Sequence, residues 1–122
     1  MNNREAIDRF MIDFPEYLPA LDELLSWWSP RDANSGLYTF FGQIIDPLVF
    51  RPMLVAGPID PDVASRFFEY LEELLDRGDQ WVRECVKDEI VEQLVSDPEW
   101  YEKVCPFAGE RLRRIYFVAK QS

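Results

Sequence analysis

Between residues 61 and 95, apolar side chains recur every three or four positions, and this spacing restricts the segment to helices with one buried face. Asp60-Pro61 is a strong helix start, because aspartate can accept hydrogen bonds from the free amides and proline lacks the amide that would stay unpaired. We expect Gly78 to end this helix in a left-handed cap and Asp79 to begin the next one. The segment is therefore predicted to form an antiparallel helical hairpin. Its expected inward-facing residues are Val63, Phe67, Tyr70, Leu71, Leu74 and Leu75 in the first helix, and Trp81, Val82, Cys85, Val86, Ile90, Leu94 and Val95 in the second.

The same spacing predicts further helices before and after the hairpin. They cover residues 4–14, residues 18–28, a short segment that starts at Asp97-Pro98 and stops before Pro106, and residues 110–120. The second of these is expected to bury a stripe of Leu18, Leu21, Leu25 and Trp28, and the last to pack Leu112, Ile115, Tyr116 and Ala119 on the hairpin. Turn-forming residues from Ser29 to Gly36 predict an exposed loop.

The apolar stretch at residues 37–50 fits a buried helix or a buried strand. Apolar positions at 41, 44, 45, 48 and 49 repeat at helical spacing and favour the helix, whereas Thr39 and Phe40 have strand propensity. Pro47 and Pro52 are expected to limit regular structure beyond that point.

Together these segments predict an all-α fold, a compact bundle of about six helices in one domain that spans residues 1–122. The repeated Asp-Pro starts leave stacked helical hairpins, as in an α-solenoid, as an alternative arrangement. No linker divides the chain.

Charge limits the classes of partner. The formal net charge of −10 argues against nucleic acid and against an anionic membrane, since both attract cations. No segment has the length and apolar character of a membrane span or a signal peptide, so we expect a soluble cytoplasmic protein. A protein partner with a basic surface fits this charge better.

The chain contains no histidine, so it lacks the usual general base and metal ligand of neutral pH. Cys85 and Cys105 lie twenty positions apart with no CxxC spacing, and they are interpreted as reduced core residues, with a single disulfide between them as the alternative. We therefore expect no enzyme activity, no metal and no cofactor. Catalysis by paired carboxylates would require two acids buried together in a cleft.

Negative charge is concentrated in the hairpin. Residues 60–102 contain fourteen acidic and four basic residues, whereas residues 103–122 contain one acidic and five basic residues. Carboxylates at helical spacing form two stripes, whose members are the candidate partner-binding residues: Glu69, Glu72, Glu73 and Asp76 on the first helix, and Glu84, Asp88 and Glu92 on the second. Such a surface would steer a cationic partner, although a merely solvated face has the same pattern. The basic run Arg111, Arg113 and Arg114 is expected to pair with the acidic hairpin.

Three motifs carry a family resemblance. Phe40-Phe41-Gly42, the run from Phe67 to Leu75, and Gly78-Asp79-Gln80-Trp81-Val82-Arg83 resemble a family of small bacterial helical proteins over about residues 10–118. Members of that family look like the acidic immunity proteins that accompany bacterial polymorphic toxins. The resemblance implies a helical inhibitor that binds one cognate toxin domain.

Two functional hypotheses follow. The first is a non-catalytic immunity protein that neutralises a cognate toxin by covering it with the acidic surface. The alternative is an adaptor or secretion chaperone that binds an effector through an apolar groove, which exposed Trp27, Trp28 or Phe50 would support. Oligomeric state stays open at this point.

Overall fold

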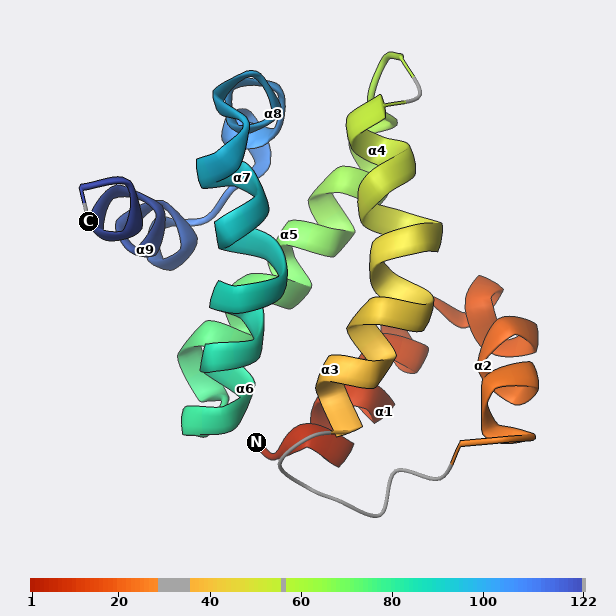
Figure 1. Ribbon diagram of the computed structural model, residues 1–122. Helices are drawn as coiled ribbons and strands as arrows, with labels where there is room; N and C mark the ends of the chain where they lie inside the picture. The colour runs from red at the N-terminus through yellow and green to blue at the C-terminus, as the bar shows by residue number, and fades with distance from the viewer. Residues whose placement is uncertain (29–35, 56, 122) are drawn as a thin grey trace.

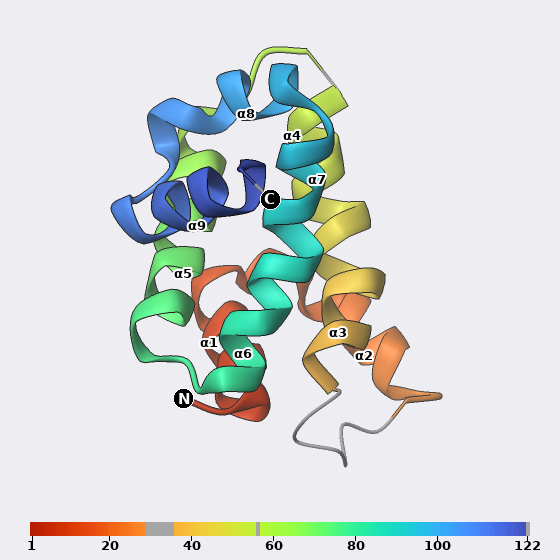
Figure 2. The same cartoon turned by 60° about the vertical axis from the view of Figure 1, so that its left-hand side comes forward.

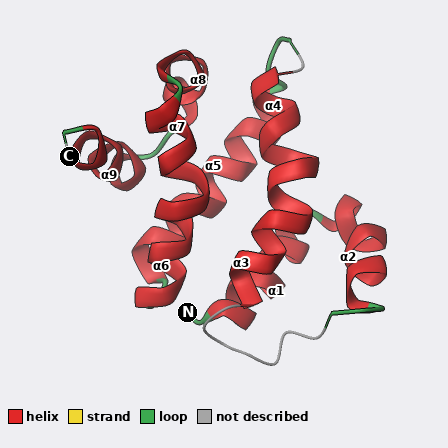
Figure 3. Cartoon of the chain, in the orientation of Figure 1, coloured by secondary structure: helices red, strands yellow, loops and turns green. Residues whose placement is uncertain are grey.

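The computed structural model describes residues 1–28, 36–55 and 57–121. These residues form seven continuous helical segments and no strand, which confirms the all-α bundle (Figure 1, Figure 3). In chain order the elements are α1 (Asn3–Asp13), η1 (Pro15–Tyr17), α2 (Leu18–Leu25), α3 (Gly36–Phe40), η2 (Phe41–Phe50), α4 (Arg51–Val55), α5 (Pro61–Arg77), α6 (Gln80–Val86), η3 (Lys87–Val91), α7 (Glu92–Ser96), α8 (Pro98–Val104), η4 (Cys105–Phe107) and α9 (Glu110–Lys120). None of the described helices is long and apolar enough to span a membrane.

Two long helices lie side by side at the centre, one running from α3 through η2 to α4 and the other from α6 through η3 to α7 (Figure 1). Helix α5 crosses behind both (Figure 1), and α9 packs on α5 and α7 (Figure 2). Residues 37–50 are therefore helical, as the apolar spacing favoured, rather than a strand. The loop predicted at Ser29–Gly36 falls outside the described residues except for Gly36, which begins α3.

The caps of the hairpin follow the sequence prediction. The Asp60 carboxylate accepts a hydrogen bond from the Asp62 amide at 2.9 Å, and the Asp79 carboxylate accepts one from the Val82 amide at 3.0 Å. The left-handed cap predicted at Gly78 is wrong, because its φ of −67° and ψ of 148° are extended. Glycine is required there for space instead: a Cβ would lie 2.2 Å from the Leu74 carbonyl oxygen and 2.6 Å from Val82 Cγ1.

Pro47 and Pro52 do not end the central helix, so that prediction is also wrong. Residues 41–50 form π-helical turns, in which the Arg51 amide donates to the Asp46 carbonyl five residues back. An α-helical turn would press the proline ring against the carbonyl four residues earlier. The wider π-helical turn gives Pro47 room and lets the helix continue to Val55.

The core is aromatic and centres on Phe10, which lies fully buried between α1, α3 and α5. Its ring stacks on Phe14 at 4.7 Å between centroids and meets Phe40 and Tyr70 edge-on at 5.3 and 5.4 Å. The Tyr70 hydroxyl also donates to the Ala6 carbonyl oxygen at 2.8 Å. Helix α1 thus packs across the middle of the chain, which closes the helices around one core instead of a row of stacked hairpins.

Two predicted apolar stripes differ from the observed ones. In α2 the buried residues are Leu21 and Leu24, with Tyr17 half-buried beside them, whereas Leu18 and Leu25 are exposed. The turn η1 before α2 places Tyr17 toward the core and so rotates the buried stripe by one position. The second hairpin helix departs from its pattern at Trp81, which is exposed, and at Val91, which is fully buried although it was not among the expected residues. Val95 is half-buried.

Candidate functional site

Three of the four candidate carboxylates of α5 contact a neighbouring helix, either α1 or α9. Glu73 pairs with Arg9 of α1 at 3.2 Å and with Arg77 at 3.2 Å. Asp76 pairs with Arg111 of α9 at 3.0 Å. Internal arginines therefore neutralise part of this predicted binding stripe. Glu69 is exposed and forms no ion pair among the described residues.

Glu72 stabilises the start of helix α9. Its carboxylate accepts hydrogen bonds from the Arg111 amide at 2.9 Å and the Leu112 amide at 3.4 Å, both in the first turn of α9. The residue at the cap position of α9, Gly109, has no side chain to do this. Glu72 is thus a helix cap supplied from α5, and a Cβ on Gly109 would lie 2.3 Å from its Oε2 atom.

The carboxylates on the second hairpin helix face other neighbours. Asp88 accepts a hydrogen bond from the Tyr38 hydroxyl of α3 at 2.7 Å. Glu84 and Glu92 are exposed, and neither forms an ion pair within the described part of the chain. The two predicted acidic stripes therefore contact different elements, since α5 uses its carboxylates toward α1 and α9 and the second helix uses Asp88 toward α3.

A polar seam runs between the two central helices, where their π-helical turns meet. The Gln93 amide donates to Asp46 Oδ1 at 2.9 Å, and Arg51 Nε lies 3.4 Å from Asp46 Oδ2. Burial raises the pKa of Glu89, and the charges of Asp46 and Asp88 raise it further. Sequence reasoning missed this seam, because nothing in the apolar spacing predicts that residues 46 and 93 meet.

Other titratable groups near the seam hold their protons at neutral pH. Burial, followed by the hydrogen bond to Asp88, raises the pKa of Tyr38, and burial raises the pKa of the Cys85 thiol. A thiol of this kind is a poor nucleophile because the thiolate is the reactive form. Cys85 and Cys105 are both free, and the described residues contain no group of three or more acidic or thiol side chains that could hold a metal ion.

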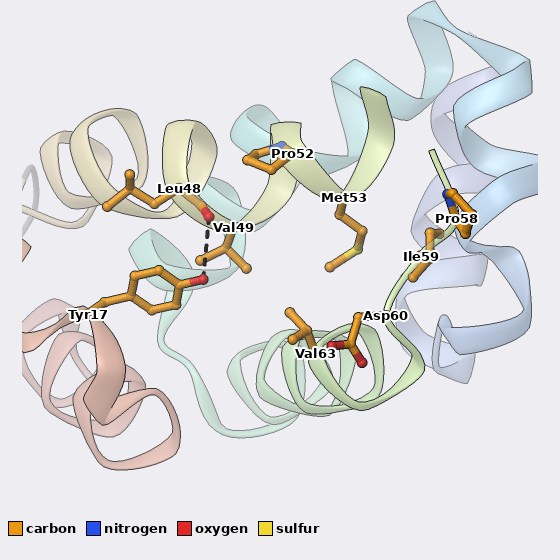
Figure 4. Close-up of a pocket in the computed structure, with 9 residues that line it drawn as sticks. All are labelled: Tyr17, Leu48, Val49, Pro52, Met53, Pro58, Ile59, Asp60 and Val63. Carbon is orange, nitrogen blue, oxygen red and sulfur yellow. Dashed lines mark hydrogen bonds between the residues drawn. The ribbon is translucent and has the colours of Figure 1, made fainter. Parts of the chain in front are cut away.

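An apolar hollow lies between η1, η2, α4 and the start of α5 (Figure 4). It holds about 200 Å³ and is lined by Tyr17, Leu48, Val49, Pro52, Met53, Pro58, Ile59, Asp60 and Val63. The Tyr17 hydroxyl donates to the Leu48 carbonyl oxygen at 3.4 Å and fixes one wall. The floor is built from side chains of η2, α4 and α5, which approach one another only in the folded chain.

A second hollow of about 250 Å³ adjoins the first and shares Leu48 with it. Its lining consists of Ala20, Glu23, Leu24, Trp27, Gln43, Ile44 and Leu48. We call the two hollows together the α2–α4 groove. Trp27 is 63% exposed and Leu48 39% exposed, so both present apolar surface to solvent. Phe50, which sequence analysis named with Trp27 as a candidate groove residue, is fully buried, and Trp28 is half-buried.

Charge in the α2–α4 groove has one sign. Glu23 lines one hollow and Asp60 lines the other, and the described residues that line the two hollows include no lysine or arginine. A third hollow, between α1 and α5, differs in that Arg9, Arg66, Asp13, Glu69 and Glu73 line it together. Its arginines pair with neighbouring acids, whereas the charged residues of the α2–α4 groove are acidic in both of its hollows.

Comparison with known proteins gives the family of the chain and nothing narrower. No curated protein and no solved structure matches the chain. A family model described as "Domain of unknown function (DUF7674)" matches residues 7–121, from the first buried turn of α1 to the residue after α9. The match covers every helix that builds the core and the groove, and the chain therefore belongs to the DUF7674 family.

Proposed function

We propose that this chain is a protein-binding domain and that the α2–α4 groove takes an apolar segment of its partner. The observation that carries the proposal is a groove in which exposed Trp27 and Leu48 lie beside Glu23 and Asp60, with no basic side chain among the described lining residues. This is the adaptor or chaperone mode of binding, in which no reaction is catalysed.

Exposure of these side chains is the physical argument. Burying apolar surface contributes roughly 25 cal/mol for each Å², so covering a tryptophan and a leucine can supply a useful share of binding energy. Tryptophan is also enriched among the few interface residues that dominate affinity. The walls of the groove are held by the core, which means that little ordering is required when a partner binds.

The lining defines the chemistry of the partner. An amphipathic helix with apolar anchors about one turn apart could reach both hollows across Leu48. Lysine or arginine at its ends would lie near Glu23 and Asp60, and the net charge of −10 would speed the encounter of such a segment. A toxin domain is the partner class that the resemblance to immunity proteins favours.

A matched pair of substitutions tests this proposal. Trp27→Glu places a charge in the groove, whereas Trp81→Glu makes the same change at an exposed tryptophan outside it. A displayed library of helical peptides is panned against the wild-type protein, and the enriched peptides are measured against both variants by calorimetry. We expect peptides rich in apolar and basic residues, whose affinity falls at least about tenfold with Trp27→Glu and stays unchanged with Trp81→Glu. Equal effects of the two variants would refute the groove.

The exposed carboxylates Glu84 and Glu92 favour a second candidate, neutralisation of a toxin through the acidic surface. The supporting observation is that both lack an ion pair among the described residues, so their field acts on solvent and partner. The product of the neighbouring reading frame would be co-expressed and its binding followed by surface plasmon resonance. Glu84→Lys with Glu92→Lys should slow association while leaving dissociation nearly unchanged, and an unchanged association rate would exclude this surface.

A further inference from the structure

Helix α9 presents an outer face that is both basic and apolar. Leu112 and Tyr116 point into the core, whereas Arg113, Arg114 and Phe117 are exposed on the opposite side. Phe117 lies four residues after Arg113 and three after Arg114, so it neighbours both arginines on the helix surface. The face therefore has a large exposed ring with guanidinium groups one turn away, and guanidinium groups are absent from the described lining of the α2–α4 groove.

Phe117 is 57% exposed and its ring contacts only the edge of Tyr116 within the described aromatic pairs, at 6.0 Å between centroids. A phenylalanine in this position leaves apolar surface in water without adding to the core. Arg111 is already engaged with Glu72 and Asp76 on the inner side of the helix. Arg113 forms no ion pair among the described residues, and Arg114 pairs only with Glu110 of its own helix.

The location of α9 excludes an intramolecular contact with the groove. Helix α9 flanks one side of the two central helices and α2 flanks the other, in both views (Figure 1, Figure 2). One copy cannot place its own α9 in its own groove while the core stays folded. Any contact between the two surfaces must therefore join two copies.

We propose that the outer face of α9 in one copy docks in the α2–α4 groove of a second copy. Phe117 enters the apolar hollow beside Leu48, and Arg113 and Arg114 approach Glu23 and Asp60. The inference rests on the proposed function of the groove and names a second copy as one occupant of it. Complementary charge supports the pairing, because residues 103–122 carry five basic residues and one acidic residue in a chain with a net charge of −10.

Such a contact is heterologous, since the two copies use different surfaces. The copy that contributes α9 keeps its groove free, and the copy that contributes the groove keeps its α9 free, so association continues head to tail beyond the dimer. Repulsion between two chains of charge −10 opposes this growth and keeps it reversible. Self-association would also cover the groove, and a partner segment would have to displace α9 of the neighbouring copy.

Two variants separate the surfaces in sedimentation velocity experiments. Phe117→Glu disrupts the docking face of α9 and leaves the groove intact. Trp27→Glu disrupts the groove and leaves the docking face of α9 intact. We expect the sedimentation coefficient of the wild-type protein to rise across about 1 μM to 1 mM, and each variant to stay at the monomer value. An equimolar mixture of the two variants should form a dimer and nothing larger, because one intact groove meets one intact α9. Trp81→Glu should behave as the wild type.

Several results would overturn the inference: a wild-type monomer at every concentration, a Phe117→Glu variant that still associates, or a mixture that stays monomeric. The groove itself is tested separately by the peptides enriched on the wild-type protein. A chain that binds those peptides without self-associating overturns the docking of α9 and leaves the proposed function intact. A chain that binds neither its own copies nor the peptides overturns both.

Discussion

Replacement of Glu72 by alanine should release the first turn of α9 from α5. The carboxylate supplies two acceptors to the Arg111 and Leu112 amides and pairs with the Arg111 guanidinium at 3.4 Å. Alanine removes all three contacts and leaves the start of α9 without a side-chain cap, since Gly109 provides none. The change therefore acts on the attachment of α9, far from the centre of the aromatic core.

The expected cost follows from these contacts. Loss of a helix cap costs about 1 kcal/mol, within a range of roughly 0.5–2 kcal/mol. A partly exposed ion pair adds about 0.2–1 kcal/mol. We expect Glu72→Ala to lower the free energy of unfolding by about 1–2.5 kcal/mol. The control is Glu69→Ala, one turn earlier on the same helix and exposed, which should stay within about 0.5 kcal/mol of wild type.

Urea unfolding followed by the fluorescence of the four tryptophans measures both variants. A second test uses Gly109→Ala, whose Cβ would lie 2.3 Å from Glu72 Oε2 and would push the carboxylate off the amides. Because both changes remove the same cap, the double variant should be more stable than additivity predicts, by at least about 0.5 kcal/mol. Equal stability of Glu72→Ala and Glu69→Ala, or strict additivity with Gly109→Ala, would refute the cap.

Three further substitutions test other parts of the structure. Burial and the charges of Asp46 and Asp88 raise the pKa of Glu89, so this carboxyl group holds its proton more tightly in the folded protein than in the unfolded chain. The folded state therefore loses stability as pH rises from 4.5, the pKa of the unfolded group, through the pKa of the folded group. Glu89→Gln should therefore raise the melting temperature at pH 7 and flatten this part of the pH profile in scanning calorimetry, whereas an unchanged profile would contradict the position of Glu89. Gly78→Ala should cost about 1–3 kcal/mol in urea unfolding, because the new Cβ meets the Leu74 carbonyl and no small side-chain shift relieves it; a neutral effect would contradict the close approach. Tyr70→Phe removes the hydrogen bond to the Ala6 carbonyl and should cost about 0.5–1.5 kcal/mol, with Tyr38→Phe as a comparison at a more exposed hydroxyl.

Local signals in the sequence predicted most helix boundaries. Asp60, Asp79 and Asp97 each cap the helix that they were expected to begin, because the cap depends on the two or three residues that follow. The spacing of residues 41–49 likewise predicted a helix through a segment whose composition also suits a strand. Helix caps and helical spacing depend on residues within one or two turns of each other, which is why they can be predicted from a single sequence.

Longer-range features were not predictable in the same way. The apolar spacing does not indicate the wider turns that accommodate Pro47, and the Asp46–Gln93 hydrogen bond joins residues 47 positions apart. The residues that line the α2–α4 groove come from η1, α2, η2, α4 and α5 and from the segments that flank them. The sequence named Trp27 only as one of three aromatic residues whose exposure would support a groove, and it did not indicate the other lining residues. Glu72 shows the limit most clearly. Its spacing marked it as one of a stripe of surface acids, whereas its partner is the backbone of α9, 39 positions later.

The basic residues at the end of the chain lie on two sides of α9, the side that packs on α5 and the side that faces outward. On the inner side, Arg111 neutralises Glu72 and Asp76, so part of the acidic excess of the hairpin balances the basic end of the chain. On the outer side, Arg113 and Phe117 have no such role, because α9 already has its buried face in Leu112 and Tyr116. A helix that needed only to cover α5 would be polar on that outer side. The basic and apolar outer face is therefore better explained by a contact between molecules, and the acidic, apolar α2–α4 groove is the described surface that complements it.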